Sequence, residues 1–172
     1  MDILHWARSV LQTTSVRWSG WAEALPAELL RRPPAPGEWS ALDCLQHLVD
    51  TEQDVFAARV GFLLAEQDFP AFDPDREGTQ PAGDVNPVDL AARFSRQRKD
   101  SLALLETVTN ADLGKRARHA ELGVVTLDEL LHEWAGHDLM HTVQAEQALM
   151  QPFIEGCGPW QPYFSAHRTK GG

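Results

Sequence analysis

Apolar residues recur at helical spacing in four long segments of the chain, which are separated by stretches rich in Pro, Gly and Asp. The first segment covers about residues 2–25. The second begins at Ser40, a favourable N-cap residue, and continues to about Gln67. Its apolar positions alternate at spacings of three and four, as in a helix that buries one stripe in a bundle. The expected buried positions are Ala41, Cys44, Leu48, Thr51, Val55, Ala58 and Phe62.

The third segment begins at Asn86-Pro87, an N-cap followed by a proline at the first helical position, and extends to about Val108. Its polar stretch from Ser95 to Asp100 is expected to be exposed. Two connections are long. Residues 26–37 contain four prolines, which exclude a long helix, and Phe69 to Val85 form a loop of a length that is often functional.

The fourth segment is predicted to start at Thr126, which forms a capping box with Glu129, and to end at about Met150, before Pro152. Residues 110–125 are interpreted as a loop with one helical turn, because a single short strand there has no visible partner.

Four helices and no convincing strand predict an all-α fold, a four-helix bundle. The 172 residues suit one domain, with a core at about 2–150 and a C-terminal tail at 151–172. The aromatic residues of that tail are expected to pack back on the bundle or to line the mouth of a site. They are Trp160, Tyr163 and Phe164.

The core-facing stripe of the fourth helix is not apolar at its centre. The positions on this stripe are Leu127, Leu130, Trp134, His137, His141, Gln144 and Ala148. Because residues at i and i+4 are neighbours on one face, His137 and His141 can direct ring nitrogens at one point, as in many metal sites. Such pairs also occur by chance, and His137 could instead bond Asp138 or a backbone carbonyl.

A metal ion needs at least one more ligand, and His47 on the facing second helix is the best candidate. Three protein ligands leave a position open for water or substrate, which is the catalytic pattern. Asp138 and Gln144 are candidates to orient the imidazoles through hydrogen bonds. The candidate catalytic bases are Asp50, Glu52 and Glu133.

The other histidines are interpreted as unrelated to this site. His132 lies five residues before His137 and projects from another face of the helix. Three more lie near the termini or in loops, where we expect solvated side chains. They are His5, His119 and His167. No nucleophile elbow, dinucleotide-binding motif or phosphate loop is present in the sequence.

The formal net charge of −10, from 25 acidic and 15 basic residues, disfavours nucleic-acid binding, although Arg93 to Lys99 form one basic run. The two cysteines, Cys44 and Cys157, form neither a C-x-x-C motif nor a disulfide framework. With no visible signal peptide and no apolar stretch near the ~20 residues of a membrane helix, we expect a cytoplasmic protein without a membrane partner.

The stretch PAPGEWSALDCLQHLVDTE, Pro34 to Glu52, together with HDLMHTVQ, His137 to Gln144, resembles the DinB-like superfamily of bacterial proteins. The resemblance runs from about Ser9 to Met150. It implies a bundle of up-down-down-up topology, a homodimer, and a divalent metal such as zinc or nickel held by three histidines, which map onto His47, His137 and His141. The family is unrelated to the DNA-repair polymerase that shares its name.

Some members of that family use low-molecular-weight thiols such as bacillithiol or mycothiol in transferase or isomerase reactions. The leading hypothesis is therefore a metal-dependent thiol S-transferase that acts on small electrophilic substrates, with the metal as thiolate ligand or Lewis acid. The rival hypothesis is a non-catalytic stress- or damage-response binding protein with a structural or vestigial metal site.

Overall fold

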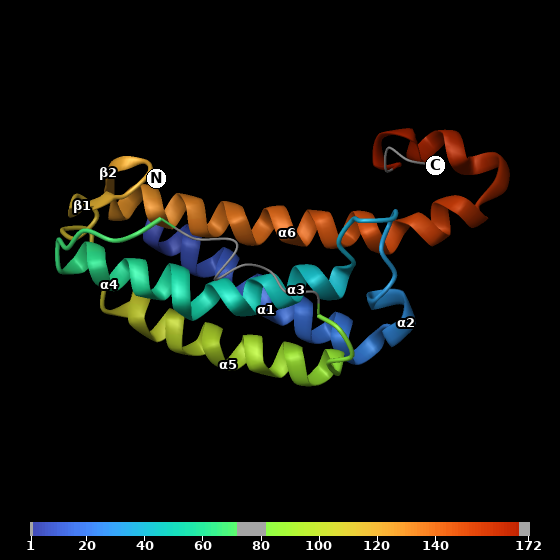
Figure 1. Ribbon diagram of the computed structural model, residues 1–172, viewed down its shortest axis with the longest axis horizontal. Coiled ribbons are helices and arrows are strands. Elements are labelled where there is room, and N and C mark those ends of the chain that lie inside the picture. The colour runs from blue at the N-terminus through green and yellow to red at the C-terminus, as the bar shows by residue number, and fades with distance from the viewer. Residues whose placement is uncertain (1, 72–81, 169–172) are drawn as a thin grey trace.

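The computed structural model describes residues 2–71 and 82–168, which form a bundle of four long helical segments (Figure 1). The first segment is α1 (Ile3–Ala24). The second consists of α3 (Ala41–Thr51), the π-helical stretch η1 (Glu52–Ala57) and α4 (Ala58–Leu64). The third and fourth segments are α5 (Pro87–Glu106) and α6 (Leu127–Gly156). The predicted all-α four-helix bundle is therefore confirmed.

The helices follow an up-down-down-up order. α1 and α6 run in one direction, and the second and third segments run in the opposite direction (Figure 1). α1 packs against α5 and α6, and α3 packs against the same two helices, so α1 and α3 lie diagonally across the bundle. The parallel second and third segments need a long connection, which residues 65–86 provide. The short helix α2 (Ala27–Leu30) lies in the connection between α1 and α3.

Side-chain caps fix the starts of three long helices where the sequence predicted them. Ser40 and Asp43 form a capping box at the start of α3, and Thr126 and Glu129 form another at the start of α6. Asn86 accepts hydrogen bonds from the first backbone N–H groups of α5. These oxygens satisfy N–H groups that have no partner within the helix, which stabilises each start by about 1 kcal/mol.

The buried stripe of the second segment shifts where the chain passes through η1. Ala58 and Phe62 were predicted to be buried, but both are only partly buried, while Val60 and Leu63 are completely buried. A π-helical turn holds more residues than an α-helical turn, so it rotates everything that follows about the helix axis. The prediction was wrong because it assumed an uninterrupted α-helical period.

A two-stranded antiparallel sheet precedes α6, where a loop with one helical turn was predicted. Its strands are β1 (Arg116–His119) and β2 (Gly123–Thr126), and Gly123 adopts the positive φ of 81° at the turn between them. The strand at 123–126 thus pairs with residues 116–119, which immediately precede it. This partner was not predicted from the sequence. Phe69 extends this pairing through a parallel bridge to His119.

α6 continues past its predicted end at Met150, through Pro152, to Gly156. Proline removes one backbone hydrogen bond from a helix, but tertiary packing can outweigh that loss. Here Gln151 and Ile154, on either side of the proline, are both buried. The packed residues therefore hold the last turn in helical conformation.

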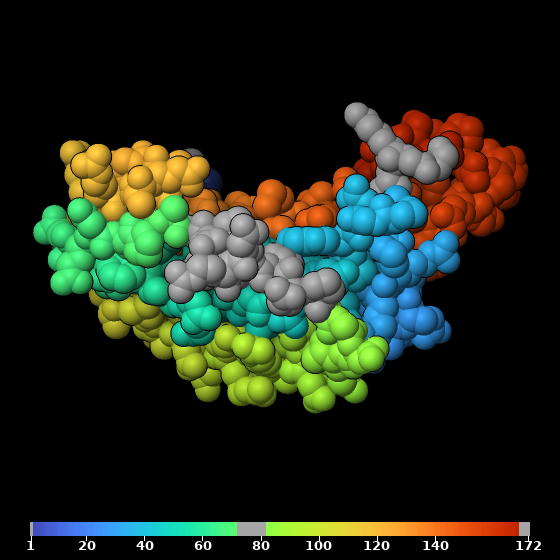
Figure 2. Space-filling view, viewed as in Figure 1, coloured from blue at the N-terminus to red at the C-terminus, as the bar shows by residue number. Residues whose placement is uncertain are grey.

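The aromatic residues of the tail do not pack back on the bundle as expected. The tail forms a 3-10 helix, η2 (Gly158–His167), which turns back after α6 and contacts the last turns of that helix (Figures 1 and 2). Trp160 and Tyr163 are largely exposed, and Phe164 is 38% exposed. These aromatic side chains therefore do not line the mouth of the histidine site.

A buried polar layer divides the core into two apolar clusters, one near the β1–β2 end and one near the α2 end. Each of the four helical segments contributes at least one buried polar side chain between its residues of the two clusters, and four of these side chains bond one another. These four side chains are Thr14, Glu52, Arg98 and Asp138. The prediction that Ser95–Asp100 is exposed was thus wrong at Arg98, of which only 1% is exposed.

Within residues 2–71 and 82–168, none of the helices is long and apolar enough to cross a membrane. The predicted functional loop from Phe69 to Val85 lies largely outside the described residues. Only its two ends, 69–71 and 82–85, belong to the described structure.

Candidate metal centre

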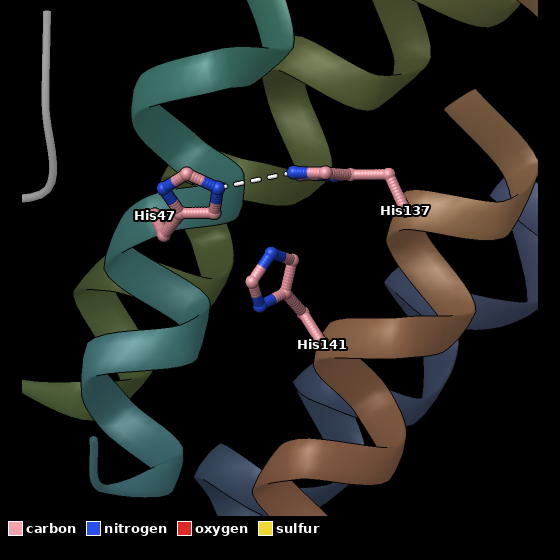
Figure 3. Close-up of side chains that lie close together, drawn as sticks. All are labelled: His47, His137 and His141. Carbon is pink, nitrogen blue, oxygen red and sulfur yellow. Dashed lines mark hydrogen bonds between the residues drawn. The ribbon is translucent and has the colours of Figure 1, made fainter. Parts of the chain in front are cut away.

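Three histidines from two facing helices meet where α3 packs against α6. His47 lies in the middle of α3, and His137 and His141 lie one turn apart on α6. Figure 3 shows the three rings directed toward one another across the space between the helices. The structure therefore brings together all three residues that were predicted as metal ligands.

The ring nitrogens lie close enough to share one ion. His47 Nε2 is 3.0 Å from His137 Nε2, and one nitrogen of each of the three rings lies within 4.8 Å of the others. In a tetrahedral zinc site with Zn–N bonds of about 2.0–2.1 Å, ligand nitrogens are about 3.3–3.4 Å apart. Small rotations of the side chains would reach that spacing, so the triad could hold a divalent ion.

Burial keeps all three imidazoles neutral. Burial, together with the neighbouring His141, lowers the pKa of His47 to about 4 and that of His137 to about 3. The pKa of His141 is also lowered by burial, against a hydrogen bond to Gln144 that raises it. At neutral pH each ring therefore has a nitrogen lone pair for a metal, and no bound proton has to be displaced.

Hydrogen bonding selects which nitrogen of His141 faces the centre. Gln144 Oε1 lies 3.0 Å from His141 Nδ1, so this nitrogen donates its proton and Nε2 carries the lone pair. Gln144 thus contacts the ring that it was predicted to orient. His137 Nδ1 is buried without a hydrogen-bond partner among the described residues. An ion at Nε2 would offset part of the cost of burying this ring.

Two aromatic side chains border the triad. Trp39 stacks on His141 at 5.7 Å between ring centroids and lies 5.2 Å from the His47 ring. Phe56 of η1 lies 4.9 Å from the His137 ring. Trp39 belongs to the stretch that carries the family resemblance, but no role was predicted for it. Its position directly before the Ser40 N-cap of the helix that bears His47 was the available signal.

Asp138 and Glu52 are bound to Arg98 rather than to the histidines. Arg98 Nε and an Nη atom donate to the two Glu52 oxygens at 2.7 Å, and Arg98 Nη1 donates to Asp138 Oδ2 at 2.6 Å. Thr14 donates to the same Asp138 oxygen. The prediction that Asp138 accepts an imidazole N–H was therefore wrong. Glu52 is a poor candidate base because its buried carboxylate is occupied by a permanent cation.

Only one of the three candidate bases remains beside the centre. Asp50 accepts a hydrogen bond from Gln46 and lies near Arg93 on α5. Because α5 lies diagonally opposite α6, Asp50 is directed away from the histidines on α6. Glu133 lies on α6 one turn before His137, where burial raises its pKa and the Arg59 guanidinium partly opposes that effect. A carboxylate with a raised pKa accepts protons more readily near neutral pH, so Glu133 fits the role best.

The remaining histidines lie outside the triad. His5 and His167 are exposed as predicted, and His132 is exposed on α6. His119 was also predicted to be solvated, but it is 5% exposed at the end of β1. The hairpin that the sequence analysis missed accounts for this burial.

These features define a helical-bundle protein in which two helices present three neutral imidazoles as a potential metal centre. The chain belongs to the DinB superfamily, whose family model matches residues 11–145. A solved structure with the same fold is YfiT from Bacillus subtilis, described as a probable metal-dependent hydrolase with an unusual four-helix bundle topology. It is 18% identical, and the match covers 87% of each chain with a TM-score of 0.73. No curated protein matches the chain.

Proposed function

We propose that this protein is a metal-dependent enzyme that transfers a small thiol to an electrophilic substrate, with zinc or nickel held by His47, His137 and His141. The observation that carries the proposal is the convergence of three neutral imidazoles from α3 and α6. Among the described residues, no fourth histidine, cysteine or carboxylate joins this group. Three ligands of this kind leave room for a reactant, whereas structural zinc sites have four.

A divalent ion at this position would supply Lewis-acid chemistry, because it lowers the pKa of a thiol or water that binds it. The protein's own residues would orient the ligands, limit the access of water and accept a proton. Gln144 orients His141, and the rings of Trp39 and Phe56 border the triad and limit the access of water. Glu133 would accept the proton that the thiol releases.

The transfer balances without any redox partner. With an alkyl chloride as electrophile, the thiol sulfur forms a bond to carbon and the carbon–chlorine bond breaks. Chloride leaves with the bonding electrons, and the thiol proton passes to Glu133 and then to solvent. Neither sulfur nor metal changes its oxidation state, which suits a d¹⁰ ion such as zinc.

Hydrolysis is the second candidate function. It is supported by the fold that the chain shares with YfiT, a probable metal-dependent hydrolase. The same three ligands and Glu133 would then act on water in place of a thiol. The two reactions would use the same residues but differ in the nucleophile and in the bond that breaks, so substrates distinguish them better than residues do.

The test compares both reactions in protein loaded with zinc or nickel. Conjugation of bacillithiol, mycothiol or cysteine to monochlorobimane is followed by fluorescence, and hydrolysis by proton release from a panel of esters and amides. We expect metal-dependent conjugation that His137→Ala abolishes and His132→Ala, an exposed control on α6, retains. Turnover that persists in metal-free His137→Ala would contradict the proposal. A stoichiometric metal without turnover on either panel would support the non-catalytic alternative.

A further inference from the structure

A π-helical stretch interrupts the helical segment that carries His47. This stretch, η1, joins α3 to α4 and contains Phe56. An α-helix turns about 100° per residue, so an unbroken helix would place Phe56 about 180° from His47, on the opposite face. A π-helical turn takes up about one extra residue, which reduces this angle to about 80°. η1 therefore brings Phe56 round to the side of the segment that carries His47.

The ring contacts of Phe56 agree with this rotation. The side chain is only 2% exposed, and its ring centroid lies 4.9 Å from that of His137 on α6. The His47 ring lies 5.1 Å from the same imidazole. Two residues that an unbroken α-helix would place on opposite faces therefore contact one histidine of the facing helix.

The Phe56 ring is itself held in place by α6. It stacks on the ring of Trp134 with 5.2 Å between the centroids and 6° between the planes. Trp134 is completely buried and precedes His137 by about one turn of α6. Because protein interiors are close-packed, stacked aromatic rings at such a position have little freedom to move. Phe56 is therefore a rigid wall beside the His137 imidazole.

The His137 ring lacks the kind of hydrogen bond that orients His141. Gln144 bonds Nδ1 of His141, whereas Nδ1 of His137 is buried without a hydrogen-bond partner among the described residues. Histidines that bind metals usually have their second nitrogen fixed by such a partner. The orientation of the His137 ring therefore depends on packing, and Phe56 is the apolar ring packed against it.

We propose that Phe56 is a positioning residue of the histidine triad and that η1 exists to place it there. The Phe56 ring keeps Nε2 of His137 directed at His47, as the Gln144 side chain does for the ring of His141. π-Helical turns are rare and are often found at functional sites, which agrees with this role. The inference rests on the metal site of the proposed function, but it does not depend on which reaction that site catalyses.

The first test compares the zinc affinity of two full-length variants, Phe56→Leu and Phe94→Leu, with that of the wild type. Phe94 is also completely buried, but it lies on α5, which carries none of the three histidines. We expect Phe56→Leu to weaken zinc binding at least about ten-fold, as for other residues that orient metal-binding histidines. Phe94→Leu should keep the wild-type affinity at a similar loss of melting temperature. Equal zinc affinities for the two variants would overturn the proposal.

A double-variant comparison locates the effect at His137. In the His137→Ala background Phe56→Leu has no ring to orient, so it should change the residual zinc affinity by less than about two-fold. In the Gln144→Ala background His137 is present, and Phe56→Leu should keep its full effect. A loss in the His137→Ala background as large as in the wild type would mean that Phe56 acts on the fold in general, and would contradict the proposal.

The metal-free protein gives a readout that needs no ion. The Nε2 atoms of His47 and His137 share a hydrogen bond of 3.0 Å, which depends on the orientation of the His137 ring. NMR of ¹⁵N-labelled histidines should detect the shared proton in the wild type and in Phe94→Leu, and lose it to solvent exchange in Phe56→Leu. Retention of this signal in Phe56→Leu would overturn the proposal. If the wild type binds no zinc or shows no turnover, the proposed function fails, and this signal still decides the role of Phe56.

Discussion

His47 Nε2 lies 3.0 Å from His137 Nε2, although 90 residues separate them in the chain. The contact depends on the up-down-down-up order, which places α3 directly against α6. Both imidazoles are neutral because burial lowers their pKa values. The fold thus brings the Nε2 atoms of two neutral imidazoles to one point, where they share a hydrogen bond, and adds a third ring, His141, one helical turn away from His137.

Gln144 should matter for metal affinity although it is not a predicted ligand. Gln144→Ala removes the oxygen that holds the Nδ1 proton of His141, so the ring is free to rotate and to change tautomer. We expect the affinity for zinc to fall about 10- to 100-fold, as for other residues that orient metal-binding histidines. Competition with a chromophoric chelator measures this affinity. Gln147→Ala on the same helix is the control, and equal affinities for both variants would contradict this role.

Arg98 should matter for stability rather than for metal binding. Arg98→Met leaves the carboxylates of Glu52 and Asp138 buried without their cation. We expect the free energy of unfolding to fall by about 3–5 kcal/mol, as when one partner of a buried ion pair is removed.

Urea denaturation measures the effect of Arg98→Met, with Arg96→Met as the matched control. Arg96 is exposed on the same helix, and its replacement should change stability by no more than about 0.5 kcal/mol. A loss below about 1 kcal/mol in Arg98→Met is what an exposed ion pair would give. It would contradict a stabilising role for the buried ion pairs of Arg98 with Glu52 and Asp138.

The metal-free protein should lose stability as the pH falls below about 6.5. Unfolded histidines take up protons near 6.5, whereas folded His47 and His137 do so only near pKa values of about 4 and 3. Between these values the unfolded state binds more protons, so acid favours unfolding. The contribution of these two histidines to the free energy of unfolding is fully present well above pH 6.5. It is lost progressively as the pH falls toward their folded pKa values of about 4 and 3.

The measurement of this pH effect is the melting temperature of chelator-treated protein from pH 7.5 to 4.5. The double variant His47→Gln, His137→Gln should lose less on acidification than the wild type. Carboxylates titrate in both proteins, so the difference between the two curves reports the histidines. Identical curves would show that these rings do not titrate differently in the folded and unfolded states.

The sequence predicted the helices and the pairing of His137 with His141 because both depend on local period and spacing. Capping residues such as Ser40 and Thr126 determine helix starts within a few residues of chain. The i, i+4 spacing placed His137 and His141 on one face, and the resemblance to the DinB-like superfamily linked them to His47. The homodimer that this resemblance also implies stays a prediction.

Features that depend on distant contacts could not be predicted in this way. Arg98 lies in a polar stretch, and only its partners on η1 and α6 make it a buried residue. The one-residue shift after η1 breaks the α-helical period on which the prediction of Ala58 and Phe62 relied. His119 is buried because the β1–β2 hairpin exists and Phe69 pairs with it.

The most direct test of the metal centre is the metal content of the protein purified without an affinity tag or chelator. Plasma mass spectrometry should find about one transition-metal ion per chain, since three neutral imidazoles form a single site. His47→Ala, His137→Ala and His141→Ala should each lose this ion, and His132→Ala should keep it. No metal in the wild type after incubation with zinc or nickel, or a stoichiometric ion in His47→Ala, would contradict the account.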